Sequence, residues 1–228
     1  MDNEKIKALK SAFPHTIPIA AGFLFLSLSY GILMSSKGFS VFYPICMSAF
    51  IYAGSMQFAS VNLLLSAFNP LAAFILTLMV NCRHLFYGIS MLNKYKDTGI
   101  KKLFLIFGLT DETFSINVSV DVPDEVDKGW FMFFVTFLNY MYWLLGTIVG
   151  SLLGKYITFN TEGIEFVLTA LFLVIFINQW LVAKSHTSAI IGVISPIICL
   201  AIFGSENFMI PSLILILAIF FIFRKKVE

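Results

Sequence analysis

The sequence predicts an all-α polytopic membrane protein, with about six to eight transmembrane or half-membrane helices in a single transporter domain over residues 1–228. Hydrophobic residues make up 59% of the chain and charged residues only 12%, whereas soluble domains have about 25% charged residues. Nearly all charges lie at the termini, in short connections or at the margins of apolar runs, and the exceptions are Arg83, Asp111 and Glu112. This distribution excludes a soluble core. The net charge of +2 is too small to indicate a nucleic-acid partner.

The expected elements are apolar runs that approach the ~20 residues needed to cross a bilayer. The first run follows several lysines, but it contains Pro14 and Pro18 and has no A-x-A cleavage site, so we expect a retained span and not a signal peptide. The runs cover residues 13–34, 41–68, 71–92, 103–120, 130–153, 163–183, 187–204 and 208–223.

The run at 41–68 is too long for one simple span. As a single helix it would measure about 42 Å, against a hydrocarbon core of about 30 Å. Ala53-Gly54-Ser55 lies at its middle, and a glycine inside a helix is unfavourable unless packing or function requires it. We predict a broken, re-entrant element that turns near the midplane and leaves on the side where it entered. The alternative is a single tilted helix.

Lysine placement predicts the orientation of the first half. Lysines precede the first run at 5–10 and crowd the loop at 94–102, so both regions should be cytoplasmic. An even number of crossings must then separate them, which a re-entrant element at 41–68 provides.

The orientation of the second half is less consistent with the same rule. If 103–120 crosses as one span, the acidic loop 121–127 lies outside and Lys155 lies inside. Continued counting then places the basic residues 224–226 outside, against the rule. Either the rule fails here or one later run, 187–204 or 208–223, is not a simple span.

The three cysteines lie singly within apolar runs, with no paired Cys or His spacing that would bind zinc. We interpret Cys46, Cys82 and Cys199 as small buried hydrophobic residues. We expect no metal and no other cofactor.

Two polar stripes run through the segments that flank the 94–102 loop. At helical spacing, Asn81, His84 and Gly88 share one face of the first segment, and Arg83 and Tyr87 share an adjoining face. The second segment has its own stripe, which begins at Asp111 and continues through Ser115 and Ser119. A stripe of polar residues is unusual in an apolar helix.

Arg83 and Asp111 are expected to reach the same depth. They lie 15 residues before and 13 residues after the loop centre near residue 98, which in an antiparallel pair places both near the midplane. One interpretation is a buried ion pair that only fixes helix register. The other is a functional site, because one arginine facing two acids leaves a carboxylate free to titrate.

Further candidates adjoin this pair. His84 is either a proton carrier or a hydrogen-bonding group between helices, and Glu112 is a candidate for protonation during transport. Half-helix ends at the predicted break expose backbone groups suited to a zwitterion, on a surface formed by Tyr52, Gly54, Ser55, Gln57 and Phe58.

Gly146, Gly150 and Gly154 form a stripe of small residues after Trp143. Such a stripe lets another helix approach closely, so we expect ordinary helix packing there, with a seat for a partner subunit as the alternative.

Three motifs in order resemble those of the AzlC-like family, the large subunits of two-component branched-chain amino acid exporters. They are Ile-Tyr-Ala-Gly-Ser-Met-Gln-Phe at 51–58, Asn-Cys-Arg-His-Leu-Phe-Tyr-Gly at 81–88 and Phe-Gly-Leu-Thr-Asp-Glu-Thr-Phe at 107–114. Many relatives in that family have aspartate where this chain has Asn81, so the change removes a possible acid.

The resemblance implies a multi-pass protein of the bacterial inner membrane that works with a small AzlD-like membrane subunit. It implies export of leucine, isoleucine, valine and, as a further candidate, methionine, coupled to protons. From the polar stripes and the predicted break, we expect the substrate-binding or coupling residues to be Arg83, His84, Asp111, Glu112, Gly54, Gln57, Asn81 and Tyr87.

Other functional classes have less support. A passive channel or a structural subunit of a membrane complex would also carry polar stripes. An intramembrane enzyme is disfavoured, because the chain has no H-E-x-x-H, no G-x-S-x-G and no metal-ligand spacing.

Overall fold

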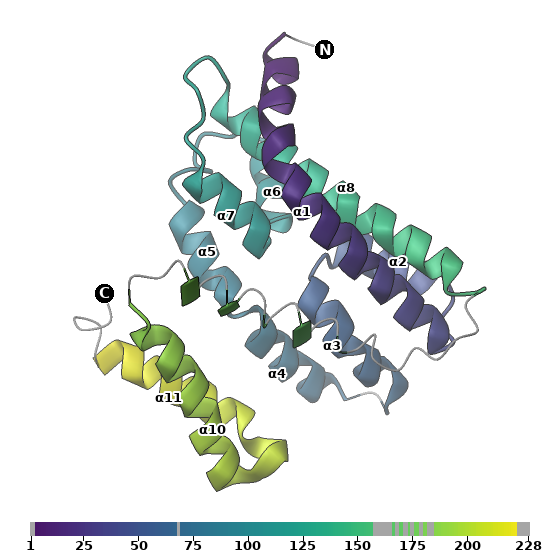
Figure 1. The fold of residues 1–228 in the computed structure, drawn as a ribbon, viewed down its shortest axis with the longest axis vertical. Coiled ribbons are helices and arrows are strands. Elements are labelled where there is room, and N and C mark those ends of the chain that lie inside the picture. The colour runs from purple at the N-terminus through teal and green to yellow at the C-terminus, as the bar shows by residue number, and fades with distance from the viewer. Residues whose placement is uncertain are drawn as a thin grey trace. The chain divides into compact units, whose positions relative to one another are not determined.

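The computed structural model describes residues 3–67, 69–156 and 185–222, together with 166, 169, 170, 173, 176, 177, 180 and 181. Across this part of the chain all regular secondary structure is helical (Figure 1). The run predicted at 163–183 and the basic residues 224–226 lie largely or wholly outside the described residues. The helices are α1 (Asn3–Ser36), α2 (Phe42–Phe50), α3 (Gly54–Leu65), α4 (Pro70–Asn81), α5 (Arg83–Met91), α6 (Lys101–Phe107), α7 (Asp111–Ser119), α8 (Lys128–Leu153), α10 (Thr187–Asn207) and α11 (Met209–Ile222).

The fold class predicted from the sequence is confirmed. Among the described residues, three helices are long and apolar enough to cross a membrane, at Asn3–Ser36, Lys128–Leu153 and Thr187–Gly204. The chain divides into two compact units, Met1–Leu168 and Thr169–Glu228, which are described separately. The expectation of a single domain over 1–228 stays a prediction.

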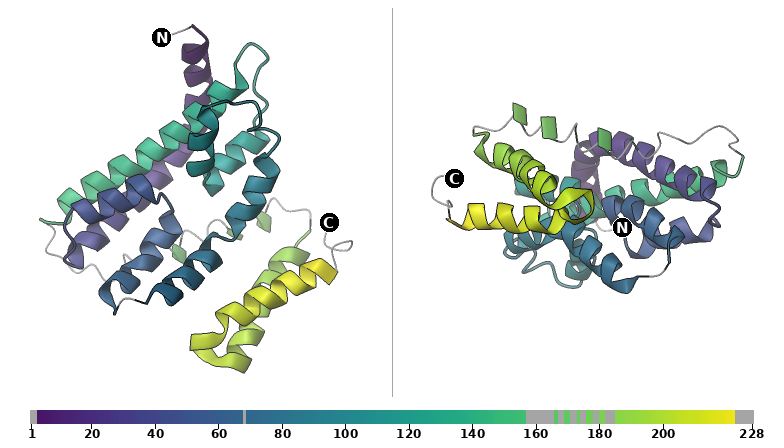
Figure 2. Two further views of the ribbon diagram at one scale, coloured as in Figure 1. Left: turned by 180° about the vertical axis from the view of Figure 1, so that it is seen from behind. Right: turned by 90° about the horizontal axis from the view of Figure 1, so that it is seen from below.

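Helices α1 and α8 pack side by side and run in the same direction through the first unit (Figures 1 and 2). Near their first turns, the ammonium of Lys5 lies 5.0 Å from the centre of the Trp130 ring. Near their last turns, the Ser35 hydroxyl donates to the Ser151 carbonyl over 2.8 Å. The two helices therefore form the scaffold against which the shorter helices pack.

The predicted glycine stripe lies in this α1–α8 contact. A Cβ on Gly150 would overlap the carbonyl of Leu28, and a Cβ on Gly154 would lie 2.6 Å from Cβ of Ser35. On the facing helix, a Cβ on Gly31 would lie 2.5 Å from the backbone nitrogen of Ser151. Close helix packing is thus confirmed, and the helix that occupies the stripe is α1 of the same chain.

The predicted break in 41–68 is confirmed, and it falls at residues 51–53 between α2 and α3. Helix α2 ends when the carbonyl of Met47 accepts from the backbone N–H groups of both Ile51 and Tyr52. The amide of Gln57 on α3 then donates to the Ser48 hydroxyl on α2, which places the two arms against each other in opposite directions. Residues 42–65 therefore form a re-entrant hairpin.

A second re-entrant hairpin corrects the prediction that 103–120 crosses as one span. Helix α6 runs along α8 in the same direction, since Lys101 lies on the Trp130 ring and Phe107 packs against Tyr140. After a break at 108–110, α7 returns along α8, with Asn139 bonded to Thr113 and with Asn117 beside Phe131. The cause is local: Thr110 has extended backbone and caps α7, so the run cannot continue as one helix.

This second hairpin also corrects the predicted sides of two loops. The acidic loop 121–127 lies at the same end of the unit as the N-terminus and the 94–102 loop, because Lys101 lies 3.7 Å from Asp127 and 4.2 Å from the centre of the Trp130 ring. Lys155 lies at the opposite end, beyond the last turn of α1. The predicted sides are wrong because they count residues 103–120, which form a hairpin, as one crossing.

The orientation of residues 224–226 stays a prediction, because they lie outside the described residues.

We predict that loop 121–127 is cytoplasmic. In a background with all three native cysteines replaced by alanine, Asp124→Cys should react with a membrane-impermeant maleimide in inside-out vesicles and not in intact cells. Ser40→Cys, at the other end of α1, should show the opposite pattern. Labelling of Asp124→Cys in intact cells would contradict the two-hairpin topology.

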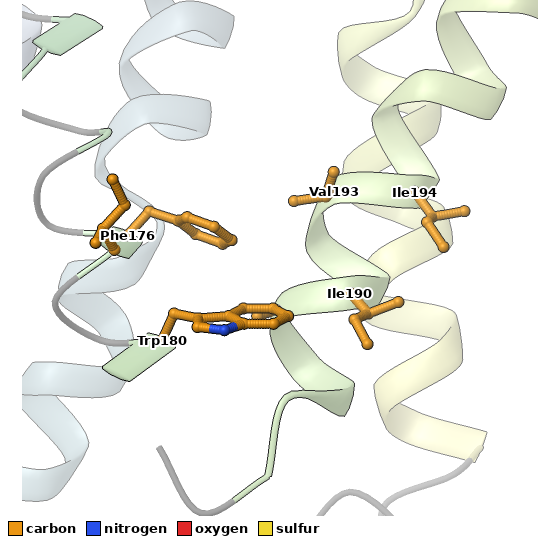
Figure 3. Close-up of a pocket in the computed structure, with 7 residues that line it drawn as sticks. Phe176, Trp180, Ile190, Val193 and Ile194 are labelled. Atoms are coloured by element: carbon orange, nitrogen blue, oxygen red, sulfur yellow. The ribbon is translucent and has the colours of Figure 1, made fainter. Parts of the chain in front are cut away.

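The second unit contains the helical hairpin α10–α11. Gly204 has a φ of 74°, a left-handed conformation that breaks the helix shortly before α11 begins. An apolar pocket of about 480 Å³ lies in this unit against α10, lined by side chains that include Phe176, Trp180, Ile190 and Val193 (Figure 3).

Candidate functional site

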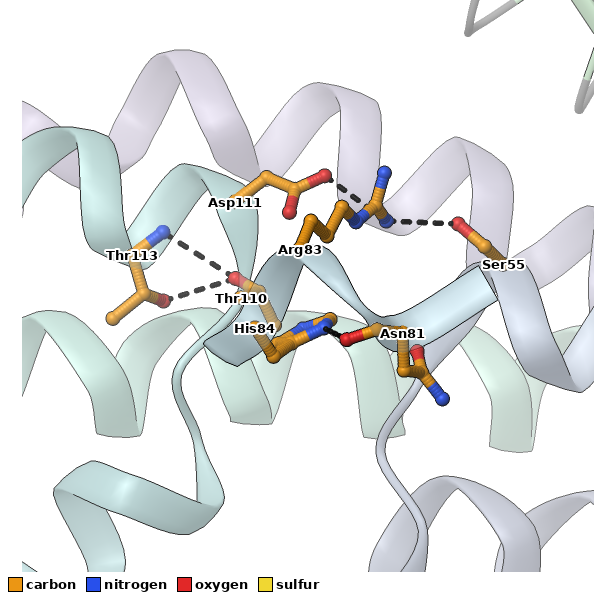
Figure 4. A network of polar contacts seen from close by, with 7 residues as sticks. All are labelled: Ser55, Asn81, Arg83, His84, Thr110, Asp111 and Thr113. Carbon is orange, nitrogen blue, oxygen red and sulfur yellow. Dashed lines mark hydrogen bonds and ion pairs between the residues drawn. The ribbon is translucent and has the colours of Figure 1, made fainter. Parts of the chain in front are cut away.

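Three helices begin at one place inside the first unit. They are α3 at Gly54, α5 at Arg83 and α7 at Asp111. Helices α3 and α7 each follow a break in an apolar run, whereas α5 is separated from α4 only by Cys82, whose backbone is helical. A guanidinium nitrogen of Arg83, Nη2, lies 3.1 Å from Asp111 Oδ2 and donates to the Ser55 hydroxyl over 3.2 Å (Figure 4). One arginine therefore connects the tips of both re-entrant hairpins to the long segment formed by α4 and α5. We call this set, Ser55, Arg83 and Asp111, the junction.

The predicted equal depth of Arg83 and Asp111 is confirmed by this ion pair. Their side chains remain 33% and 26% exposed, so the pair is partly desolvated and not sealed in a dry core. The second carboxylate oxygen of Asp111, Oδ1, is buried and has no hydrogen-bond partner of good geometry among the described residues, although the Tyr87 side chain lies near this carboxylate. A buried unsatisfied acceptor costs about 1–3 kcal/mol, so this oxygen is suited to a donor that arrives with a ligand.

Glu112 lies beside the pair in the first turn of α7. Within the described part of the chain it forms no ion pair, whereas its neighbour Asp111 does. Thr110 fixes this turn, because its hydroxyl accepts from the Thr113 backbone N–H over 3.3 Å (Figure 4). The arrangement of one arginine and two acids thus keeps one carboxylate outside the pair, as the sequence indicated.

The two polar faces predicted on the 81–88 segment are also distinct in the structure. Asn81, His84 and Gly88 line a cavity of about 490 Å³ that the tips of both hairpins also line. Tyr87 instead stacks on Phe114 of α7, with ring centres 4.4 Å apart, next to the Arg83 face. His84 Nδ1 lies 3.2 Å from the Asn81 carbonyl oxygen, within hydrogen-bond distance.

Gln57 occupies a different position from the other candidates. Its side chain is fully buried, where its oxygen accepts from the indole N–H of Trp143 over 3.0 Å and its nitrogen donates to Ser48 over 2.8 Å. Ser48 in turn lies 2.8 Å from the Thr147 hydroxyl. Gln57 therefore fixes the first hairpin to α8 and does not line the cavity.

Gly54 is required by the same packing. A Cβ at this position would lie 2.7 Å from the ring of Trp143, so only glycine lets α3 begin against the indole. The tip is thus positioned by one glycine and one tryptophan.

We predict that Trp143→Phe destabilises the protein by about 1–3 kcal/mol, because it leaves the buried Gln57 oxygen without a donor. Thermal unfolding in detergent measures the loss. The double variant Trp143→Phe/Gln57→Leu should be more stable than Trp143→Phe alone, since both partners are then apolar. A double variant that shows the summed loss of the two single variants would contradict this role.

Tyr52 has a backbone feature that no sequence pattern indicated. Its φ is 48°, in the left-handed region that a bulky side chain rarely adopts. Its ring packs against Phe107 of the other hairpin and against Tyr140 of α8, with centres 6.0 and 5.0 Å apart. Strained backbone of this kind persists where the surroundings hold it and often marks a working site.

Comparison with known proteins gives a match to one family over most of the first unit. The sequence profile of the family described as AzlC protein matches residues 18–157, which include both hairpins and the junction. The chain belongs to the AzlC family. It is 58% identical to the branched-chain amino acid transport protein AzlC of Bacillus subtilis, over 97% of this chain and 87% of that protein.

Other membrane proteins are also similar to most of the chain. An uncharacterized membrane protein of Haemophilus influenzae is 46% identical over 93% of this chain and 87% of its own length. The inner membrane protein YgaZ of Escherichia coli is 26% identical over 88% of this chain and 82% of its own length. No solved structure matches the chain.

The AzlC family membership and the apolar helices identify a membrane protein with a role in transport. They indicate a transporter in place of an enzyme, in line with the absence of catalytic motifs from the sequence.

Proposed function

We propose that this chain is the large subunit of a secondary active transporter that exports leucine, isoleucine, valine and, as a further candidate, methionine. The observation that carries the proposal is the bridge from Arg83 to Ser55 and Asp111, where three helix starts meet. Discontinuous helices that meet inside the membrane are a common way to build a transport site. The substrate class is taken from the name of the Bacillus subtilis relative, a branched-chain amino acid transport protein.

The junction suits an amino acid in its zwitterionic form. Helix α3 begins without a side-chain cap, so its first backbone N–H groups and the positive end of its dipole favour a carboxylate. The buried Oδ1 of Asp111 has no hydrogen-bond partner of good geometry among the described residues. It would accept a hydrogen bond from the ammonium group of the substrate. Arg83 holds these two elements together, and its release from Asp111 or Ser55 is the step that would let the hairpins separate.

We also propose that Glu112 carries the coupling proton. It lies beside Asp111 and outside the Arg83 pair, so it can change charge without breaking the junction. Glu112→Gln should abolish export driven by a pH gradient and leave substrate exchange at or near the wild-type rate. Loss of both activities, or of neither, would contradict this role.

Two further parts of the proposal come from the family resemblance. The chain works in the bacterial inner membrane as a multi-pass protein, together with a small AzlD-like membrane subunit. Co-purification of that subunit with this chain is the first check on the assembly.

The decisive experiment is counterflow in proteoliposomes. Vesicles that contain both subunits and are loaded with unlabelled leucine should accumulate labelled leucine from outside. Vesicles with this chain alone show whether it transports by itself or needs its partner. No exchange of any branched-chain amino acid with both subunits present would overturn the proposal, and accumulation that never exceeds equilibrium under a proton gradient would indicate a passive channel.

A further inference from the structure

The cavity of about 490 Å³ beside the junction has a mainly apolar lining. Leu85 and Ile89 of α5 and Phe107 of α6 are among the apolar side chains that line it. Its volume lies within the roughly 300–1,000 Å³ typical of small-molecule sites. It is therefore suited to an apolar group of a small molecule.

The cavity reaches the start of α3, which belongs to the proposed binding site. Tyr52 and Ala53 line it, and Ala53 directly precedes the first residue of α3, Gly54. The junction residues Ser55, Arg83 and Asp111 are not part of its lining, and Arg83 lies on the adjoining face of α5. The cavity therefore lies next to the backbone N–H groups of α3 that are proposed to bind the carboxylate, and it offers space for the side chain of the same molecule.

Gly88 is an unusual element of the wall. A Cβ at this position would meet no atom of the described residues within 4 Å, whereas a Cβ on Gly54 would collide with Trp143. Packing among the described residues thus does not require glycine at position 88. The missing side chain leaves open space on the cavity side of α5, one turn beyond His84 on the same face.

We infer that this cavity holds the side chain of the transported amino acid, and that Gly88 sets the largest side chain it accepts. The inference rests on the proposed function and adds to it the residue that determines size selectivity. A methyl group on α5 at this position narrows the cavity without displacing any neighbour.

Competition counterflow with valine and leucine tests the inference, because these substrates differ by one methylene. One methylene in a hydrophobic pocket changes discrimination by roughly 10–200-fold, so Gly88→Ala should weaken leucine relative to valine by about tenfold. Gly88→Ser should do the same, since it adds similar volume with a different polarity. The matched control is Gly22→Ala on α1, where a Cβ also meets nothing within 4 Å but the residue is not part of the cavity lining.

The outcomes distinguish a failure of the proposed function from a failure of the role assigned to Gly88. If the wild-type protein exchanges neither substrate, the proposed function itself fails. If it exchanges both and Gly88→Ala leaves the ratio of leucine to valine unchanged, or lowers both equally, the function stands and the role of Gly88 is refuted. Thermal unfolding of each variant should be at or above the wild-type temperature, which shows that any change does not come from misfolding.

Discussion

Asp111→Asn is expected to abolish substrate exchange while the protein still folds. The change removes the negative charge that faces Arg83 and replaces the carboxylate proposed to bind the substrate ammonium by a neutral amide. A hydrogen bond to a charged group contributes about 1.5–3 kcal/mol. We expect a loss of exchange of about tenfold to a hundredfold or more, since each 1.4 kcal/mol of lost binding corresponds to a factor of ten. Counterflow of labelled leucine measures it.

The double variant Arg83→Gln/Asp111→Asn separates a structural pair from a functional one. It contains no uncompensated charge at the junction, so its unfolding temperature should recover toward that of the wild type. Exchange should stay lost if the pair binds substrate or moves during transport. Recovery of exchange together with stability would show that the pair only fixes helix register, which was the alternative left open by the sequence.

Much of the junction was predictable because charge in an apolar helix is rare. Arg83 and Asp111 were the exceptions in an otherwise regular pattern, and counting from their shared loop gave the correct depth for both. The break in 41–68 followed from its length and its central glycine, and the structure places it within three residues of that glycine.

The second hairpin was missed because length alone does not reveal it. Residues 103–120 have the length of a short span, and the break is encoded only by Gly108 and by Thr110 before two acids, a helix-start pattern. The conflict with the lysine rule at residues 224–226 is not decided by this hairpin, because those residues lie outside the described part of the chain.

Contacts between distant segments could not be predicted from one sequence. Gly150 indicated that another helix packs closely there, but nothing in the sequence identified Gly31 and Leu28 of α1 as the facing surface. The left-handed backbone of Tyr52 likewise depends on both hairpin tips and α8 together.

Gly150→Ala is expected to be strongly destabilising, although alanine is the better helix former. The new methyl group would overlap the Leu28 carbonyl and lie 2.7 Å from Leu28 Cα, and backbone cannot yield as a side-chain tip does. Overpacking costs about 1–3 kcal/mol, occasionally more, and here the upper end applies because the whole α1–α8 contact must open. The gain in helix propensity, about 1 kcal/mol, is too small to offset it.

Gly22→Ala on α1 is the matched comparison. Its Cβ meets nothing within 4 Å, so only the propensity gain remains and the unfolding temperature should stay level or rise. Thermal unfolding in detergent therefore should give opposite signs for the same chemical change at positions 150 and 22. Equal effects would mean that α1 and α8 are not packed backbone to backbone. The scaffold that carries both hairpins would then be looser than the parallel pair described above, and the depth at which Arg83 meets Asp111 would no longer be fixed by it.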